Sequence, residues 1–312
     1  MKTLLRIGTR ASQLAVTQAT WVKHRIESTH PQIRVELTKI TTKGDRILDV
    51  PLAKVGGKGL FVKEIEDALL AGEVDLAVHS MKDVPTELPE GLHIGVIPLR
   101  EIPQDAFVST RYASLDALPH GAKVGTSSLR RKSQLAALRP DLTIVDLRGN
   151  IDTRLRKLDE GLFDAILLAG AGLNRMGLQQ RITTLLSAEQ MLPAIGQGSL
   201  GIELRRNDQD LLQILQFLHD PDTAVTVSAE RAFLLRLEGG CQVPIGAHAL
   251  LAGGTITLTG LIAGVDGRHI IKETMTGPAE QATALGTTLA ESLLAQGGKA
   301  LLDAVYSPLP AQ

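Results

Sequence analysis

The single cysteine of the chain, Cys241, lies in a setting that favours chemistry. Gly239 and Gly240 precede it and Pro244 follows shortly after, which predicts a tight, exposed loop just past a helix. A lone cysteine is most often a small buried hydrophobe. An exposed cysteine invites a chemical reason, because its thiolate is a nucleophile. That the chain has a single cysteine therefore favours a buried, unreactive side chain, whereas its predicted place in an exposed loop favours a covalent role.

A basic, hydroxyl-rich segment, Gly125 to Lys132, offers a second chemistry, which is the binding of anions. It places small hydroxyl residues and backbone N–H groups at a predicted helix start, the end that carries partial positive charge. Several arginines lie at or after predicted strand ends, where open α/β sheets bind ligands. Arginine suits carboxylates because its planar fork donates two parallel hydrogen bonds. The candidate anion-binding residues are Arg10, Ser12, Thr126, Ser128, Arg130, Arg131, Arg148 and Arg154.

Each of these arginines alone has a simpler explanation, as a solvated surface group. One exposed ion pair is worth only about 0–1 kcal/mol. Binding through charge therefore requires several convergent arginines in a partly desolvated cleft. The matching ligand would carry several carboxylates or phosphates.

The segment from His79 to Pro85 follows a predicted strand and adds charged groups at the same kind of sheet edge. Lys82 suits an anion at this place. Asp83 suits a cationic intermediate or an N–H donor, although a lone aspartate in a turn before a proline is also a capping residue. We expect His79 to be a core histidine, or one that supports the ligand-binding residues from behind, rather than a ligand itself. The sequence contains no metal-ligand spacing.

Three glycines at positions 56, 57 and 59 lie beside Lys54 and Lys58. Glycine permits backbone angles that other residues avoid, so this segment suits a mobile basic flap over a cleft. A plain loop before a helix is the alternative. The spacing of a Walker phosphate loop is absent.

Hydrophobic periodicity indicates which elements position these residues. Short apolar strands alternate with amphipathic helical segments, which predicts βαβ units, an α/β fold and largely parallel sheets. A short echo between residues 7–12 and 124–128, each a strand end that runs into a helix, suggests two related halves. The predicted strands span 4–8, 33–37, 74–78, 123–125, 143–147 and 165–169, and the predicted helices cover 15–26, 61–69, 128–138 and 151–158.

Two segments mark the connections: 98–104, which contains two prolines, and 192–199, which contains one proline and two glycines. Two crossings between two α/β lobes would make a hinge. After Pro221 the pattern changes, and strands followed by a helix predict a smaller α+β domain. Its predicted elements are a helix over 223–237, strands over 255–262 and 269–275, and a helix over 282–293 closed by two glycines.

The composition narrows the class of protein. A length of 312 residues with 44% hydrophobic content suggests two or three domains. A net charge of −1 and an aromatic content of 3% give no general attraction to nucleic acid or to an anionic membrane. No apolar run reaches the ~18 residues that span a bilayer, and the first residues are too polar for a secretory signal. With one cysteine, these features predict a cytoplasmic protein.

These motifs together resemble the porphobilinogen deaminase family, also called hydroxymethylbilane synthase, over essentially the whole chain. We see no departure at the positions that carry the family's chemistry, and the C-terminal region matches least distinctively. The resemblance implies an enzyme of tetrapyrrole biosynthesis. The matching segments are 6–10, 52–61, 78–85, 124–131, 147–154, 192–198 and 237–246.

The resemblance implies an α/β fold of two type II periplasmic-binding-protein-like lobes with a cleft between them, plus a smaller α+β C-terminal domain. Domain 1 would span residues 1–98 plus about 198–218, with the catalytic aspartate and the flap. Domain 2 would span 104–193 and be rich in arginine. Domain 3 would span 222–312 and carry the cysteine on a loop.

The resemblance also implies a reaction. Cys241 would hold a dipyrromethane cofactor through a thioether, and four porphobilinogen molecules would be added head to tail, each with loss of ammonia. Hydrolysis would release the linear tetrapyrrole hydroxymethylbilane. Asp83 would face the pyrrole N–H groups and stabilise the cationic azafulvene. The cofactor-binding residues would be Lys82, Thr126, Ser128, Arg130, Arg131 and Arg148, and the substrate-binding residues Arg10, Ser12, Lys54, Lys58, Arg154 and Arg175.

Two hypotheses from other classes stay open at this point. A two-lobed, non-enzymatic carboxylate-binding protein fits the lobe pattern, although the Cys241 loop counts against it. A thiol hydrolase would use Cys241 for transient acyl intermediates. The expected partner is the substrate porphobilinogen, with no nucleic acid, membrane or metal, and the expected state is a monomer.

Overall fold

The structure, a computed structural model, describes residues 2–46, 62–238 and 243–306. The chain divides into two compact units. The first unit comprises Met1–Glu101 and Gly198–Ala224, and the second comprises Ile102–Gln197 and Val225–Gln312. Two of the division points fall within the predicted crossing segments 98–104 and 192–199. Residues 104–193 and 222–312 lie mostly in one unit, so their separation into two domains stays a prediction.

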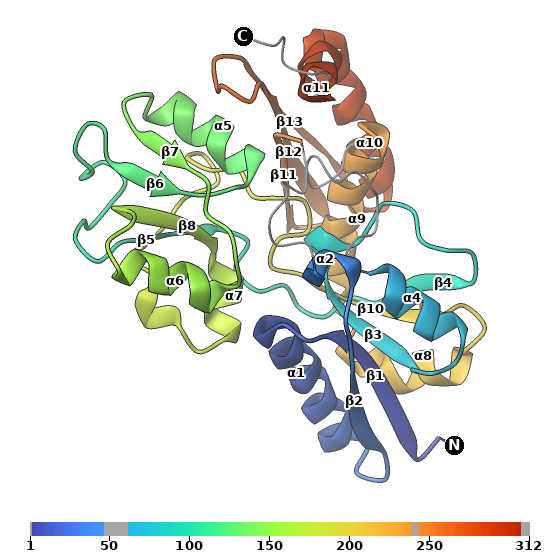
Figure 1. Cartoon of the computed structure of the whole chain (residues 1–312). Helices are drawn as coiled ribbons and strands as arrows, with labels where there is room; N and C mark the ends of the chain where they lie inside the picture. Colours follow the sequence, from blue (N-terminus) through green and yellow to red (C-terminus); the bar gives the residue numbers. More distant parts are fainter. Residues whose placement is uncertain (1, 47–61, 239–242, 307–312) are drawn as a thin grey trace. The chain divides into compact units, whose positions relative to one another are not determined.

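The first unit is built on a five-stranded sheet in the order β2-β1-β3-β10-β4 (Figure 1). The strands β1, β2 and β3 are parallel, whereas β10 runs antiparallel to both β3 and β4. Apolar side chains such as Leu5, Ile7 and Ile202 are fully buried in its core. The strands are β1 (Leu4–Arg10), β2 (Arg34–Ile40), β3 (Leu76–Ser80), β4 (Leu92–Val96) and β10 (Leu200–Arg205).

Helices of the first unit begin and pack as their sequences indicate. The hydroxyl of Ser12 accepts a hydrogen bond from the Ala15 N–H and so caps the first helix, which buries Ala19, Val22 and Ile26 against the sheet. The helices are α1 (Gln13–Thr29), α2 (Lys43–Arg46), α4 (Lys63–Leu70), the 3₁₀ turn η1 (Met81–Asp83), α8 (Gln209–Leu215) and η3 (Gln216–Leu218).

The second unit opens with another five-stranded sheet, in the order β7-β6-β8-β5-β9. Here too three strands are parallel, and β5 runs antiparallel to β8 and β9. Its elements are β5 (Asp105–Val108), β6 (Lys123–Gly125), α5 (Leu129–Leu138), β7 (Thr143–Val145), α6 (Ile151–Asp159), β8 (Ala165–Ala169), α7 (Gly170–Arg175), η2 (Gln179–Arg181) and β9 (Thr184–Leu185).

The two five-stranded sheets share one plan, which confirms the predicted relation between the halves. In each sheet the antiparallel strand, β10 or β5, is the first strand formed after the chain passes from the other unit. The prediction of largely parallel sheets was therefore wrong for two of the strand pairings in each sheet. Hydrophobic periodicity reports that a strand is buried but carries no information on its direction.

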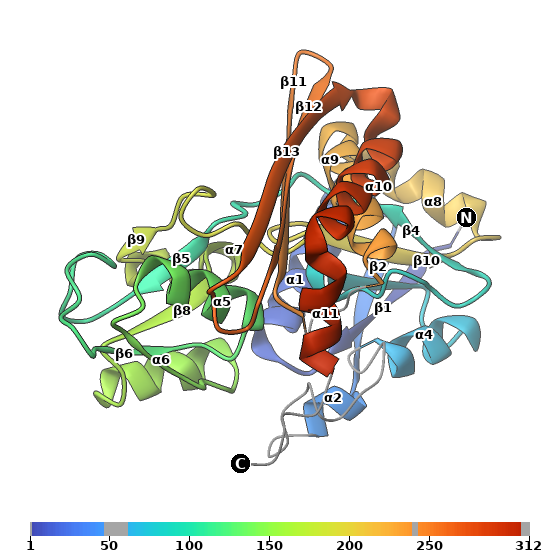
Figure 2. The ribbon, with the colours of Figure 1, turned by 90° about the horizontal axis from the view of Figure 1, so that it is seen from above.

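The remainder of the second unit is a three-stranded antiparallel sheet in the order β11-β12-β13, with helices packed on one face (Figure 2). Together with the two α/β sheets, it confirms the predicted fold class. Its elements are α9 (Pro221–Arg236), which starts in the first unit, β11 (Ile245–Ala252), β12 (Thr255–Ala263), β13 (Ile270–Pro278), η4 (Ala279–Gln281), α10 (Ala282–Leu293), η5 (Leu294–Gly298) and α11 (Lys299–Tyr306).

Within the second unit, the three-stranded sheet packs closely on the α/β sheet's helix α5. A side chain at Gly267, in the turn between β12 and β13, would collide with the Ser133 carbonyl of α5. The buried carboxylate of Glu230 on α9 accepts hydrogen bonds from the N–H groups of Gly196 and Ala249. The segment 192–199 is thereby held to α9 and to β11.

Candidate functional site

The first group of predicted site residues gathers at the C-terminal ends of β1 and β3. Arg10, Ser12, His79 and Asp83 line one small cavity of about 50 Å³. This volume accommodates roughly one or two water molecules. A larger hollow of about 420 Å³ runs along α1, and none of the predicted site residues lines it. The smaller cavity is therefore the candidate site of this unit.

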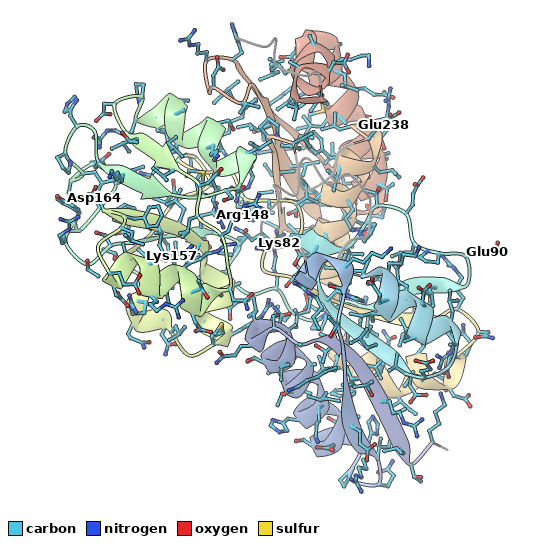
Figure 3. All side chains as sticks on the ribbon, viewed as in Figure 1. Lys82, Glu90, Arg148, Lys157, Asp164 and Glu238 are labelled. Atoms are coloured by element: carbon cyan, nitrogen blue, oxygen red, sulfur yellow. The ribbon has the colours of Figure 1, made fainter. Side chains whose placement is uncertain are left out.

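The turn that carries Lys82 and Asp83 is firmly anchored. The Met81 N–H donates to the Ser199 carbonyl, and Met81 packs so closely on Gly201 that a side chain there would collide with its sulfur. Asp83 is exposed and makes no hydrogen bond to another described residue. The structure gives no support to the turn-capping alternative for Asp83. Lys82, labelled in Figure 3, precedes Asp83 in the same turn η1.

Behind this cavity lies a group of buried titratable side chains. His79 Nε2 is 2.9 Å from Glu203 Oε2, and both side chains are almost fully buried. His79 was expected in the core, and the structure confirms it. Glu66, which is 6% exposed, has a pKa raised to about 7, because burial and the negative charge of Glu203 disfavour its ionised form.

The raised pKa of Glu66 predicts a pH-dependent gain of stability in Glu66→Gln. Between pH 4.5 and about 7 the folded protein binds a proton that the unfolded chain has released, so wild-type stability falls as the pH rises through this window. Glutamine mimics the protonated acid and avoids this loss. We expect the free energy of unfolding of the variant to exceed that of wild type by about 1–3 kcal/mol at pH ~8 and to match it at pH ~5. Urea titrations at both pH values provide the measurement, with the exposed Asp67→Asn as control. An equal difference at the two pH values would contradict the assignment.

The second group of predicted site residues gathers at the matching corner of the second unit. The hydroxyl of Ser128 accepts a hydrogen bond from the Arg131 N–H and caps α5, as Ser12 caps α1. The Ser128 N–H is 3.3 Å from Thr126 Oγ1. The two corners are therefore built alike, with a serine cap directly after a strand end.

Arg130 and Arg131 are buried in this corner rather than solvated, and they share one carboxylate. Arg130 Nη1 is 2.7 Å from Asp105 Oδ2, and Arg131 donates Nε and Nη2 to Asp105 Oδ1 at 3.1 and 2.7 Å. Asp105 is completely buried, and the two guanidinium groups hold its pKa well below its usual range despite that burial. Gln197 Nε2 also donates to Asp105 Oδ1.

This shared carboxylate predicts a large destabilisation in Asp105→Asn. The substitution leaves two buried guanidinium groups without their anion, which should lower the free energy of unfolding by about 3–5 kcal/mol near neutral pH. The stabilisation is fully present above the carboxyl's ordinary pKa near 4 and declines as the pH falls below it, so the difference should shrink in acid. Asp141→Asn, which breaks the more exposed Arg139 pair, is the matched control and should cost far less. Urea unfolding curves that coincide for the two variants would refute the assignment.

Further arginines make this corner strongly positive. The Arg154 Nε donates to the Gly149 carbonyl at 2.7 Å, and burial together with the nearby Arg131 charge lowers the pKa of Arg154 to about 10. Arg148 follows β7, at the opposite end of the sheet from Asp164 (Figure 3). Arg175 ends α7, directly after β8. Arg148 and Arg175 are both partly buried.

Three predicted site residues, Cys241, Lys54 and Lys58, lie outside the described residues, as do the whole predicted flap and the glycines before the cysteine. Within the described ranges, the other candidates gather in two places, one in each unit. Sequence reasoning missed Asp105, Glu203 and Glu66. Asp105 and Glu203 lie on the two unpredicted antiparallel strands, so no predicted element pointed to them.

Two family models match the chain. One, described as "Porphobilinogen deaminase, dipyromethane cofactor binding domain", matches residues 5–213, and the other, described as "Porphobilinogen deaminase, C-terminal domain", matches residues 224–295. The chain belongs to the porphobilinogen deaminase family. A porphobilinogen deaminase of Pelobacter propionicus is 58% identical over 302 residues, which cover 97% of each chain. One of Syntrophotalea carbinolica is 59% identical over 307 residues, 98% of each chain.

A solved structure of a Burkholderia cenocepacia nutrient binding protein bound to methionine is similar to 68% of this chain and 90% of its own. The TM-score is 0.41 and the identity is 16%, which is too low to bear on function. In the part of the chain that the structure describes, no helix is long and apolar enough to cross a membrane. The same part holds no group of three or more His, Cys, Asp or Glu side chains suited to a metal ion.

Proposed function

We propose that this protein is the enzyme that joins four porphobilinogen molecules head to tail on a cysteine-linked dipyrromethane and releases hydroxymethylbilane by hydrolysis. The family match favours this function over the two-lobed carboxylate-binding alternative. It also favours it over the thiol hydrolase, because the first matching family domain is one that binds a dipyrromethane cofactor.

The observation that carries the proposal is the excess of positive charge at the β6–β8 corner of the second unit. Arg130, Arg131 and Arg154 bring three cations together, whereas Asp105 supplies one anion. Removing three cations from water costs free energy that one buried anion does not fully offset. A ligand with several carboxylates would offset it, and each pyrrole of the cofactor and product carries an acetate and a propionate. These residues therefore fit a dipyrromethane.

The roles of the individual residues follow from their chemistry. We propose that Thr126, Ser128, Arg130, Arg131, Arg148 and Lys82 bind the cofactor carboxylates, and that Arg10, Ser12, Arg154, Arg175, Lys54 and Lys58 bind the substrate. When bound, the dipyrromethane supplies the nucleophilic pyrrole carbon. Cys241 would hold it through a thioether, which resists the hydrolysis that releases the product.

Asp83 would act on the reacting atoms. Its exposed carboxylate accepts hydrogen bonds from pyrrole N–H groups and stabilises positive charge that develops when ammonia leaves. The same carboxylate accepts the proton that the pyrrole ring loses when the new bond forms. The anchored turn from Met81 fixes its position, so little reorganisation accompanies the reaction.

Product analysis distinguishes this enzyme from the binding protein. Purified protein incubated with porphobilinogen should release one ammonia for each porphobilinogen consumed and one linear tetrapyrrole for every four. Binding of porphobilinogen without ammonia release would favour the carboxylate-binding alternative. We further propose that the enzyme works as a monomer in the cytoplasm, without a metal, nucleic acid or membrane partner, which sedimentation and cell fractionation can test.

A further inference from the structure

A buried cluster of two carboxylates and one imidazole in the first unit has no role in the function proposed above. Glu66 on α4, His79 on β3 and Glu203 on β10 are 6%, 6% and 1% exposed. His79 Nε2 is 2.9 Å from Glu203 Oε2. One oxygen of each glutamate, Oε1 in both, is buried without a hydrogen-bond partner among the described residues. The cluster therefore has acceptor oxygens available for a further proton.

The cluster reaches the candidate site through one of its members. His79 lines the cavity that Asp83, Arg10 and Ser12 also line. Glu66 and Glu203 do not line it. Glu203 contacts His79 directly at 2.9 Å, and the charges of both Glu203 and His79 act on Glu66. The cavity holds roughly one or two water molecules, and a water there can pass a proton between the Asp83 carboxylate and the imidazole.

We propose that Glu66, Glu203 and His79 form a proton reservoir for the reaction at Asp83, filled through His79 each time a carbon–carbon bond forms. The inference rests on the proposed function. In each addition the substrate's C–N bond breaks, and its ammonium group leaves as ammonia with the bonding electrons. The pyrrole carbon of the tethered chain forms the new C–C bond. Its C–H electrons return to the ring, and one proton is released.

This released proton is what the reservoir takes up. Asp83 accepts it from the ring and passes it to His79, and the cluster stores it among its three members until ammonia or water removes it. Asp83 is then ionised again for the next addition. Glu66 and Glu203 lie outside the cavity, and His79 acts on the proton only through Asp83, so all three are positioning residues rather than catalytic residues.

The charges around the cluster suit this role. Burial and Glu203 raise the pKa of Glu66 to about 7, while His79 opposes the rise. A group with a pKa near the working pH both accepts and returns a proton readily. Because the three groups interact, this titration belongs to the cluster as a whole. Other charged or titratable groups on the elements packed around it are Asp67 on α4, His93 on β4, Arg205 on β10 and Arg10 on β1.

The test compares Glu66→Gln with Asp67→Asn in the cofactor-loaded protein. Both substitutions remove one carboxylate from α4, but Asp67 is exposed and Glu66 is buried. Turnover is measured between about pH 5 and about pH 9. We expect an inflection near pH 7 in wild type, and the same inflection slightly lower in Asp67→Asn, because Asp67 is the weakest of the charges that raise the Glu66 pKa. Glu66→Gln should lose the inflection or move it by about one pH unit or more. If Glu66 had a purely structural role, the substitution would lower turnover by the same factor at every pH and would leave the inflection where it is.

A second readout does not depend on activity. Infrared difference spectra between acid and alkaline pH should show a buried protonated carboxyl that titrates near pH 7 in wild type and is absent in Glu66→Gln. If the variant does not fold, the wild-type spectrum alone decides, because absence of such a band would overturn the reservoir.

The outcomes separate this inference from the function on which it rests. Superimposable pH profiles for wild type and Glu66→Gln, in proteins that consume porphobilinogen and release ammonia, would overturn the reservoir alone. Failure of the wild-type protein to release ammonia from porphobilinogen would overturn the proposed function, and the reservoir with it.

Discussion

A Cys241→Ser protein should purify with the mass of the bare chain and convert almost no porphobilinogen. The serine hydroxyl is far less nucleophilic than a thiolate, so the thioether to the dipyrromethane does not form. Without the tether, each addition becomes a reaction between separate molecules. Tethering is worth effective molarities of about 10⁵ M or more, so we expect turnover to fall by at least about 10³-fold.

The matched control for this variant is Glu238→Gln, which alters an exposed residue just before the cysteine loop and keeps the thiol (Figure 3). It should carry the cofactor and turn over as wild type does. Intact-protein mass and tetrapyrrole formation are the two measurements. Full turnover by Cys241→Ser would show that the chain grows without attachment to this residue.

Asp83→Asn should keep its cofactor and still lose most of its turnover. Asparagine preserves the shape of the side chain but neither carries the negative charge that stabilises a cation nor accepts the ring proton. General acid–base groups contribute about 10²–10⁴-fold to rate, and we expect kcat to fall within that range. The cofactor mass should be unchanged, because Asp83 takes no part in the thioether.

The control for Asp83→Asn is Glu90→Gln, an exposed carboxylate on the loop between β3 and β4 (Figure 3). Its kcat should equal that of wild type. Single-turnover kinetics on cofactor-loaded proteins separate the chemical steps from product release. A near-normal rate for Asp83→Asn would return Asp83 to an ordinary turn residue.

The sequence predicted those parts of the fold that rest on local patterns. The helices that start after Ser12 and Ser128, and the strands that precede them, follow from short-range periodicity. The capping by these two serines was not predicted, because both hydroxyls were assigned to anion binding. The core position of His79 was predicted although the predicted strand ended at residue 78, and the structure extends β3 through His79 to Ser80. The last predicted helix was expected to end at Gly297 and Gly298. In the structure the chain kinks at Gly297 and then continues as a further helix, α11.

What could not be predicted depends on partners distant in the sequence. In the sequence, Arg130 and Arg131 have no nearby carboxylate to pair with. The carboxylate that they share, Asp105, is 25 and 26 residues away, on a strand that no motif marks. Glu203 is 124 residues from His79, and their contact exists only because β10 inserts beside β3. A single sequence shows where each strand lies, because that depends on local periodicity, but it does not show which strands pair with one another.

The mass of the intact protein, before and after brief exposure to porphobilinogen, tests the central claim most directly. The account predicts a purified species heavier than the 33.3 kDa chain by one dipyrromethane. Porphobilinogen should then add a ladder of up to four equal steps, each the mass of the substrate less one ammonia. A single peak at the bare chain mass, unchanged by porphobilinogen, would contradict it.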